Sequence, residues 1–69
     1  MTPPEYLAAA GAALYGARWQ SELAAALGVS RQHLLRLLSG ERAVQPHHLD
    51  RARDLLRARG LRIRELLVA

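Results

Sequence analysis

Cysteine is absent from this chain, which excludes disulfide bridges and thiolate metal sites as sources of stability. A domain of 69 residues buries only a modest core, so it depends on good helix packing or on oligomerisation. No apolar run approaches the ~20 residues of a membrane span, and no basic segment precedes an apolar stretch at the N-terminus. These absences predict a single cytoplasmic domain, without a signal peptide, over residues 1–69.

Lysine and phenylalanine are also missing, and all ten basic residues are arginine. A GC-rich genome accounts for arginine in place of lysine, but not for a net charge of +4. An excess of basic residues suits a polyanionic partner. Alanine and leucine dominate the apolar residues, which favours helices over strands.

Four segments carry apolar residues at helical spacing and are the predicted helices. They cover residues 3–15, residues 19–27, residues 31–38 and residues 46 to about 59. Thr2, Pro3 and Glu5 have the spacing of a capping box at the start of the first segment. Ser30 is a good N-cap for the third. The last stretch, residues 60–69, begins with a glycine and forms either a fifth helix or a dimerisation tail. The pattern predicts a compact all-α fold of four to five helices.

The most informative stretch runs from Gln20 to Gly40. Two helices joined by a tight turn cross steeply, which demands a small residue at the crossing, a turn residue, a cap and inward apolar residues. Such residues follow one another in the required order: Ala24, Gly28, Val29, Ser30, Leu34 and Leu37. Gly28 supplies the positive φ of the turn, and Ser30 caps the second helix.

This stretch resembles the helix-turn-helix of the lambda-repressor and Cro family. Seven spaced positions agree without a gap: Gln20, Ala24, Gly28, Val29, Leu34, Leu37 and Ser39-Gly40. With one helix before the motif and at least one after it, the resemblance covers roughly Leu7 to Arg59. It implies a bacterial or phage protein, acting in the cell or the infected host, that binds specific double-stranded DNA as a transcriptional repressor or autoregulator.

The resemblance also implies that the second motif helix enters the major groove. If the leucines at 34, 37 and 38 face inward, the outward residues are the candidates for base contacts: Ser30, Arg31, Gln32, Leu35 and Arg36. Arginine suits guanine and glutamine suits adenine, and a leucine can contact a thymine methyl group. The alternative for Arg31 and Gln32 is that they form an ordinary solvated first turn. The alternative for Leu35 is that it packs against its own chain or a partner chain. Leu35 departs from the family average because it is apolar at a position that the family usually points at DNA.

Residues that flank the same surface are the predicted phosphate contacts: Arg18, Gln20, Ser21, His33, Ser39 and Arg42. Gln20 begins a helix whose free N–H groups suit a phosphate, and the family uses this glutamine for that purpose. The alternative for Arg42, which follows Glu41, is that its side chain is simply solvated. Trp19 is expected to pack at the core or its rim.

The three histidines are poorly arranged for a metal. His47 and His48 point about 100° apart on a helix, and no acidic or cysteine residue lies at ligand spacing. No glycine-rich phosphate loop is present, and a chain this small offers little pocket. The sequence therefore predicts no cofactor, no catalysis, no membrane and no small-molecule substrate. The arginines between positions 51 and 64, interleaved with acidic residues, are expected to form a solvated helix face.

Apolar residues near the C-terminus exceed what one small core needs, and they are the predicted dimer surface: Leu61, Ile63, Leu66, Leu67 and Val68. A homodimer places two recognition helices about 34 Å apart on a pseudo-palindromic operator. The alternative is a frayed tail. A competing function is a protein-interaction module, such as an antitoxin or an adaptor, that uses Leu35 and these leucines to bind a protein.

Overall fold

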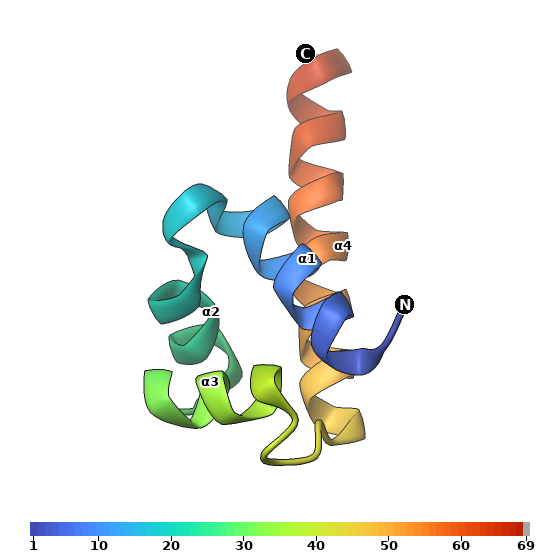
Figure 1. Ribbon diagram of the computed structural model, residues 1–69. Coiled ribbons are helices and arrows are strands. Elements are labelled where there is room, and N and C mark those ends of the chain that lie inside the picture. Colours follow the sequence, from blue (N-terminus) through green and yellow to red (C-terminus); the bar gives the residue numbers. More distant parts are fainter. Residues whose placement is uncertain (69) are drawn as a thin grey trace.

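Four α-helices and one turn of 3-10 helix make up the part of the chain that the computed structural model describes, residues 1–68 (Figure 1). The elements are α1 (Pro3–Tyr15), η1 (Gly16–Arg18), α2 (Trp19–Leu27), α3 (Arg31–Ser39) and α4 (Pro46–Val68). The bounds of α1 and α2 are those predicted from the sequence, and α3 extends one residue further. The all-α prediction is confirmed.

A capping box begins α1, as the sequence predicts. The Thr2 hydroxyl accepts a hydrogen bond from the Glu5 N–H at 3.3 Å, and the Glu5 carboxylate accepts one from the Thr2 N–H at 3.4 Å. The helix ends at Gly16, whose φ of 77° interrupts the helical hydrogen bonding. These two boundaries depend only on local residues, which is why the sequence locates them.

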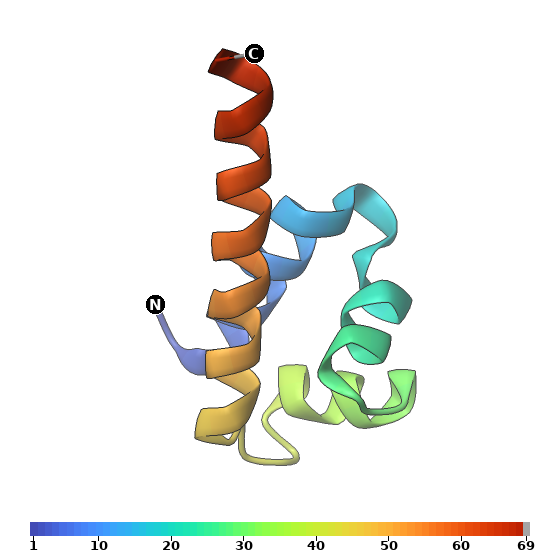
Figure 2. The ribbon, with the colours of Figure 1, turned by 180° about the vertical axis from the view of Figure 1, so that it is seen from behind.

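The core lies where all four helices meet, with α1 packed against each of the other three. Its buried apolar residues are Leu7, Ala10, Leu14, Leu23, Ala24, Leu34, Leu37 and Ala52. Half-buried residues surround this cluster, among them Trp19 and Val44. Viewed from behind, α4 is a straight rod, α2 and α3 lie to its right, and the loop after α3 leads to its lower end (Figure 2).

Helix α4 continues through Gly60 to Val68, so the predicted break before a fifth helix is wrong. Glycine in a helix interior costs about 1 kcal/mol relative to alanine, but it does not by itself stop a helix. Good helix formers follow it, and Arg62 pairs with Glu65 one turn later at 3.2 Å. The distal part of α4 therefore projects beyond the other helices (Figure 1). The molecule as a whole measures 44 × 22 × 20 Å.

Candidate nucleic-acid interface

The turn between α2 and α3 is closed by two backbone hydrogen bonds. The Val29 N–H donates to the Ala24 carbonyl at 3.0 Å, and the Gly28 N–H donates to the Ala25 carbonyl at 3.1 Å. Gly28 has φ 75° and ψ 27°, the left-handed conformation that such a helix end requires. The prediction of a positive φ at this glycine is confirmed.

Ser30 then begins α3 as its N-cap. Its hydroxyl accepts a hydrogen bond from the His33 N–H at 3.0 Å, which satisfies one of the free donors of the first turn. Leu34 and Leu37 lie on the inward side of α3 and are fully buried, and Leu38 is half-buried. These inward leucines fix the rotation of the helix about its own axis, and this rotation decides which side chains face outward.

All five predicted base-contacting residues are exposed. They belong to the N-cap and the outward side of α3: Ser30, Arg31, Gln32, Leu35 and Arg36. Leu35 is 39% exposed, so its own core does not cover it. The fold thus presents two arginines, a glutamine and an apolar side chain on one short helix.

A shallow hollow separates the beginnings of α2 and α3. Its lining brings the predicted phosphate contacts Arg18, Gln20 and Ser21 together with Arg31. No side chain caps α2 at Arg18, so the first N–H groups of this helix have no side-chain acceptor. The beginning of a helix and two guanidinium groups suit an oxygen anion, although Glu22 in the first turn of α2 lowers the local positive potential.

The predicted contacts at the other end of α3 have partners of their own. The Arg36 Nε lies 3.9 Å from the Glu41 Oε2, and both side chains are exposed. The Ser39 hydroxyl donates to the Arg36 carbonyl at 3.1 Å and accepts from the Glu41 N–H at 3.4 Å. Arg42 is exposed in the loop that follows. An exposed ion pair is worth at most about 1 kcal/mol, so Glu41 competes only weakly for Arg36.

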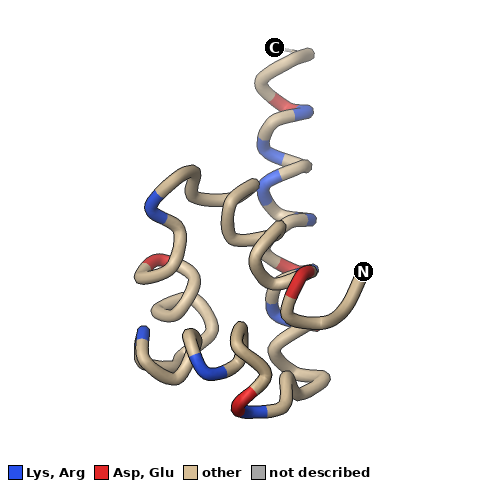
Figure 3. The backbone as a smooth tube through the Cα atoms, viewed as in Figure 1, with Lys and Arg blue, Asp and Glu red and all other residues tan. Residues whose placement is uncertain are grey.

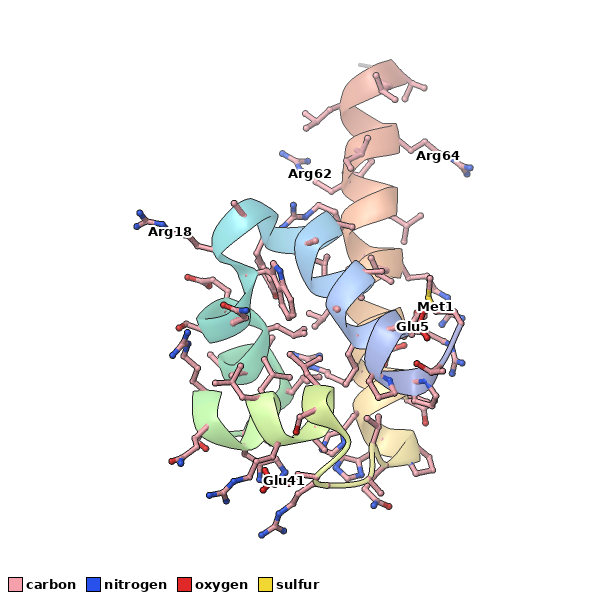
Figure 4. All side chains as sticks on the ribbon, viewed as in Figure 1. Met1, Glu5, Arg18, Glu41, Arg62 and Arg64 are labelled. Atoms are coloured by element: carbon pink, nitrogen blue, oxygen red, sulfur yellow. The ribbon has the colours of Figure 1, made fainter. Side chains whose placement is uncertain are left out.

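Basic positions lie along α3 and the loop after it, and also along α4 (Figure 3). The labelled arginine side chains lie in two separate places on the molecule. Arg18 points away from the body beside α2, whereas Arg62 and Arg64 extend from the distal part of α4 (Figure 4). The basic surface near α3 is therefore distinct from the basic residues of the projecting helix.

His33, a predicted phosphate contact, also packs against another histidine of the chain. It is half-buried on α3, and its ring meets the ring of His48 edge-on, with 6.3 Å between centroids. It still lines an open hollow with Arg42 and His47, so an oxygen anion there has access to it. No cluster of potential metal ligands occurs among the described residues.

His48 is a core residue that the sequence reasoning missed. It is 4% exposed, and its Nδ1 accepts a hydrogen bond from the Gln45 N–H at 3.0 Å, which caps α4. Burial lowers the pKa of His48 below its ordinary value of 6.5, and the nearby His47 and His33 rings lower it further. The available signal was its position one turn before Ala52 on the inward stripe of α4.

Exposed ion pairs form on α4 between Asp50 and Arg53 at 3.4 Å and between Asp54 and Arg57 at 3.5 Å, as suits the predicted solvated face. Arg51 differs from these residues: its Nε donates to the Ala26 carbonyl of α2 at 3.1 Å. The sequence placed Arg51 on a solvated face. A contact across 25 residues leaves no local pattern by which to predict it.

The five residues predicted to form a dimer surface are all exposed on the distal part of α4. Their exposed fractions run from 50% at Ile63 to 80% at Leu67 and Val68. They are helical through Val68. No helix within residues 1–68 is long and apolar enough to cross a membrane.

Two helices joined by a left-handed glycine turn, the second one capped and carrying exposed arginine and glutamine, define a DNA-binding helix-turn-helix domain. A family model described as helix-turn-helix matches residues 20–66, from the beginning of α2 into the distal part of α4. The chain belongs to this family, of the lambda-repressor and Cro type. Comparisons with curated proteins and with solved structures find no match.

Proposed function

We propose that this protein is a transcriptional repressor or autoregulator that reads the major groove with residues 30–39. The observation that carries the proposal is the division of α3 into two sides. Leu34 and Leu37 are buried and fix the helix, while Arg31, Gln32 and Arg36 are exposed without any role in the core. The fold alone gives no reason for those three residues.

The roles follow from hydrogen-bonding geometry. Arg31 and Arg36 each offer a guanidinium fork for the O6 and N7 of guanine, and the Gln32 amide matches the N6 and N7 of adenine. Ser30 and Leu35 complete the surface with a hydroxyl and an apolar contact for a thymine methyl group. Each good bidentate contact discriminates between bases by about 1–3 kcal/mol.

Phosphate contacts on both sides of α3 would set its position on the duplex without reading sequence. The hollow at the beginning of α2 supplies Arg18, Gln20 and Ser21 together with uncapped N–H groups. The opposite side supplies His33, Ser39 and Arg42.

The proposed active form is a homodimer on a pseudo-palindromic operator. One short helix reads few base pairs, so a second copy is needed for useful specificity. The apolar residues from Leu61 to Val68 are exposed on a helix, and a second copy of the same surface would cover them.

Substitution of Leu67 by arginine should abolish dimers in sedimentation at micromolar concentration, whereas Arg64→Ala should preserve them. A wild-type monomer both with and without DNA would contradict the dimer.

The deciding experiment is selection of bound sequences from a random duplex pool, followed by binding measurements on the selected operator. Arg31→Ala and Gln32→Ala should each lose operator affinity and keep affinity for random DNA. Arg57→Ala removes the same charge as Arg31→Ala, from an exposed position on α4, and serves as the control for that variant. Equal loss on every sequence would make Arg31 and Gln32 phosphate contacts and not base readers.

A protein-interaction module is the second candidate, because Leu35 is 39% exposed on α3 and the distal leucines lack a cover in their own chain. Salt dependence separates the two functions. A DNA binder that neutralises several phosphates loses affinity for random duplex steeply as salt rises. No binding to duplex DNA even at low salt would overturn the proposed function in favour of the interaction module.

A further inference from the structure

The C-terminal end of α2 carries a hydrogen bond that the helix-turn-helix motif does not explain. The last carbonyls of a helix have no partner within it, and the turn satisfies two of them, at Ala24 and Ala25. The next carbonyl, at Ala26, accepts instead from the Arg51 Nε of α4 at 3.1 Å. A cation at this end of a helix also interacts favourably with the helix dipole.

This hydrogen bond is unlike every other in the described residues. The others outside the helices join groups six residues apart or fewer, whereas Arg51 and Ala26 are 25 residues apart. Apart from this bond, α2 and α4 are connected through apolar packing in the core. Arg51 is therefore the polar restraint between the helix-turn-helix and the long helix that supports it.

We infer that Arg51 is a positioning residue for DNA binding. By holding the end of α2, it holds the turn at Gly28 and Val29, and the turn sets where α3 begins. The side chain acts within the protein and is not a phosphate contact, although it is an exposed arginine in a DNA-binding domain. The inference about binding rests on the function proposed above, while the restraint on the turn does not.

The test compares Arg51→Ala and Arg51→Lys with Arg57→Ala, which changes an exposed arginine of the same helix whose partner within residues 1–68 is Asp54. The first readout is the amide NMR spectrum and hydrogen exchange of the free protein. Arg51→Ala should shift the signals of Gly28 and Val29 and speed their exchange, and Arg57→Ala should leave both unchanged. The lysine variant keeps a donor on a long stem and should recover part of the wild-type spectrum.

The second readout is affinity for the selected operator as a function of salt, at a temperature where each variant is folded. Loss of one charge-assisted hydrogen bond should lower the affinity of Arg51→Ala about tenfold. The slope of log affinity against log salt should stay at the wild-type value, and Arg51→Lys should bind between the two. A phosphate contact would instead reduce the slope by about 0.9.

Two results would overturn the inference: a reduced salt slope in Arg51→Ala, or amide signals and affinity indistinguishable from those of Arg57→Ala. If Arg51→Ala fails to fold, Arg51→Lys supplies the same comparisons. If the wild-type protein binds no duplex DNA, the proposed function fails, and the amide signals of Gly28 and Val29 still decide whether Arg51 restrains the turn.

Discussion

Gly11 is the position where helix propensity and packing make opposite predictions. It lies inside α1, where replacement of glycine by alanine ordinarily stabilises a helix by about 1 kcal/mol. The structure places the Trp19 indole directly over it. A Cβ at Gly11 would overlap Trp19 Cε3, lie 2.9 Å from Trp19 Cδ2, and lie 3.1 Å from Leu23 Cδ2. Carbon atoms prefer separations of about 3.5–4.0 Å, so the indole must move.

The magnitude follows from these two opposing contributions. Overpacking of this kind costs typically about 1–3 kcal/mol, and the middle of this range, about 2 kcal/mol, exceeds the gain in helix propensity by about 1 kcal/mol. Gly11→Ala should therefore be less stable than wild type by about 1 kcal/mol, which lowers the melting temperature of a domain this small by about 4–8 °C. Because Trp19 immediately precedes Gln20, displacement of the indole should also change its fluorescence and weaken DNA binding.

Gly60 provides the matched control. It also lies inside a helix, but nothing lies within 4 Å of the position that its Cβ would occupy. Gly60→Ala should raise the free energy of unfolding by about 1 kcal/mol. Thermal unfolding followed by circular dichroism measures both variants, at a concentration where sedimentation gives one species. If Gly11→Ala stabilised the protein as much as Gly60→Ala does, the packing of Trp19 on α1 would be wrong.

Three further variants test the described contacts. Burial lowers the pKa of His48 below 6.5, so its contribution to stability is complete above pH 6.5 and is lost as pH falls through the folded pKa. His48→Gln keeps an acceptor for the Gln45 N–H without titrating near neutrality, and its urea midpoint should depend less on pH. Ser30→Ala removes the cap of α3 and should cost about 1 kcal/mol, measured by urea unfolding. Leu37→Ala removes a fully buried side chain and should cost about 2–5 kcal/mol, whereas Leu35→Ala should barely change the melting temperature.

Each of these variants has an outcome that contradicts its reasoning. An unchanged pH dependence in His48→Gln would mean that His48 does not resist protonation in the folded protein. Ser30→Asp should restore the stability lost in Ser30→Ala but weaken DNA binding through its charge, so a failure to restore stability would argue against the cap. Comparable losses for the two leucines would place Leu35 in the core.

The sequence predicts most of the fold because local chemistry decides most of its helix boundaries. Capping residues, left-handed glycines and an initial proline act within one turn, and the structure has α1, α3 and the end of α2 where these residues place them. Gly60 is the exception, because a single glycine inside a helix specifies no stop. There the good helix formers that follow outweigh its conformational entropy.

The candidate site also has a part that local sequence predicts and a part that it does not. The outward residues of α3 follow from the inward leucines, and the structure exposes all of them. The burial of His48 and the contact from Arg51 to Ala26 depend on how α4 returns to the other helices. Tertiary packing decides those contacts. Arg51 gives no periodic signal that distinguishes it from a solvated residue, and for His48 the signal is limited to its position one turn before Ala52 on the inward stripe of α4.

The straight course of α4 restricts how two copies can share one duplex. α3 lies beside the N-terminal end of α4, where His33 meets His48, and the exposed leucines lie at the opposite end (Figure 1). If two copies joined through antiparallel α4 helices, their α3 helices would lie at opposite ends of the pair and could not reach neighbouring grooves. A dimer that binds DNA through both copies therefore needs the two α4 helices to run in the same direction, with the symmetry axis along them and perpendicular to the duplex.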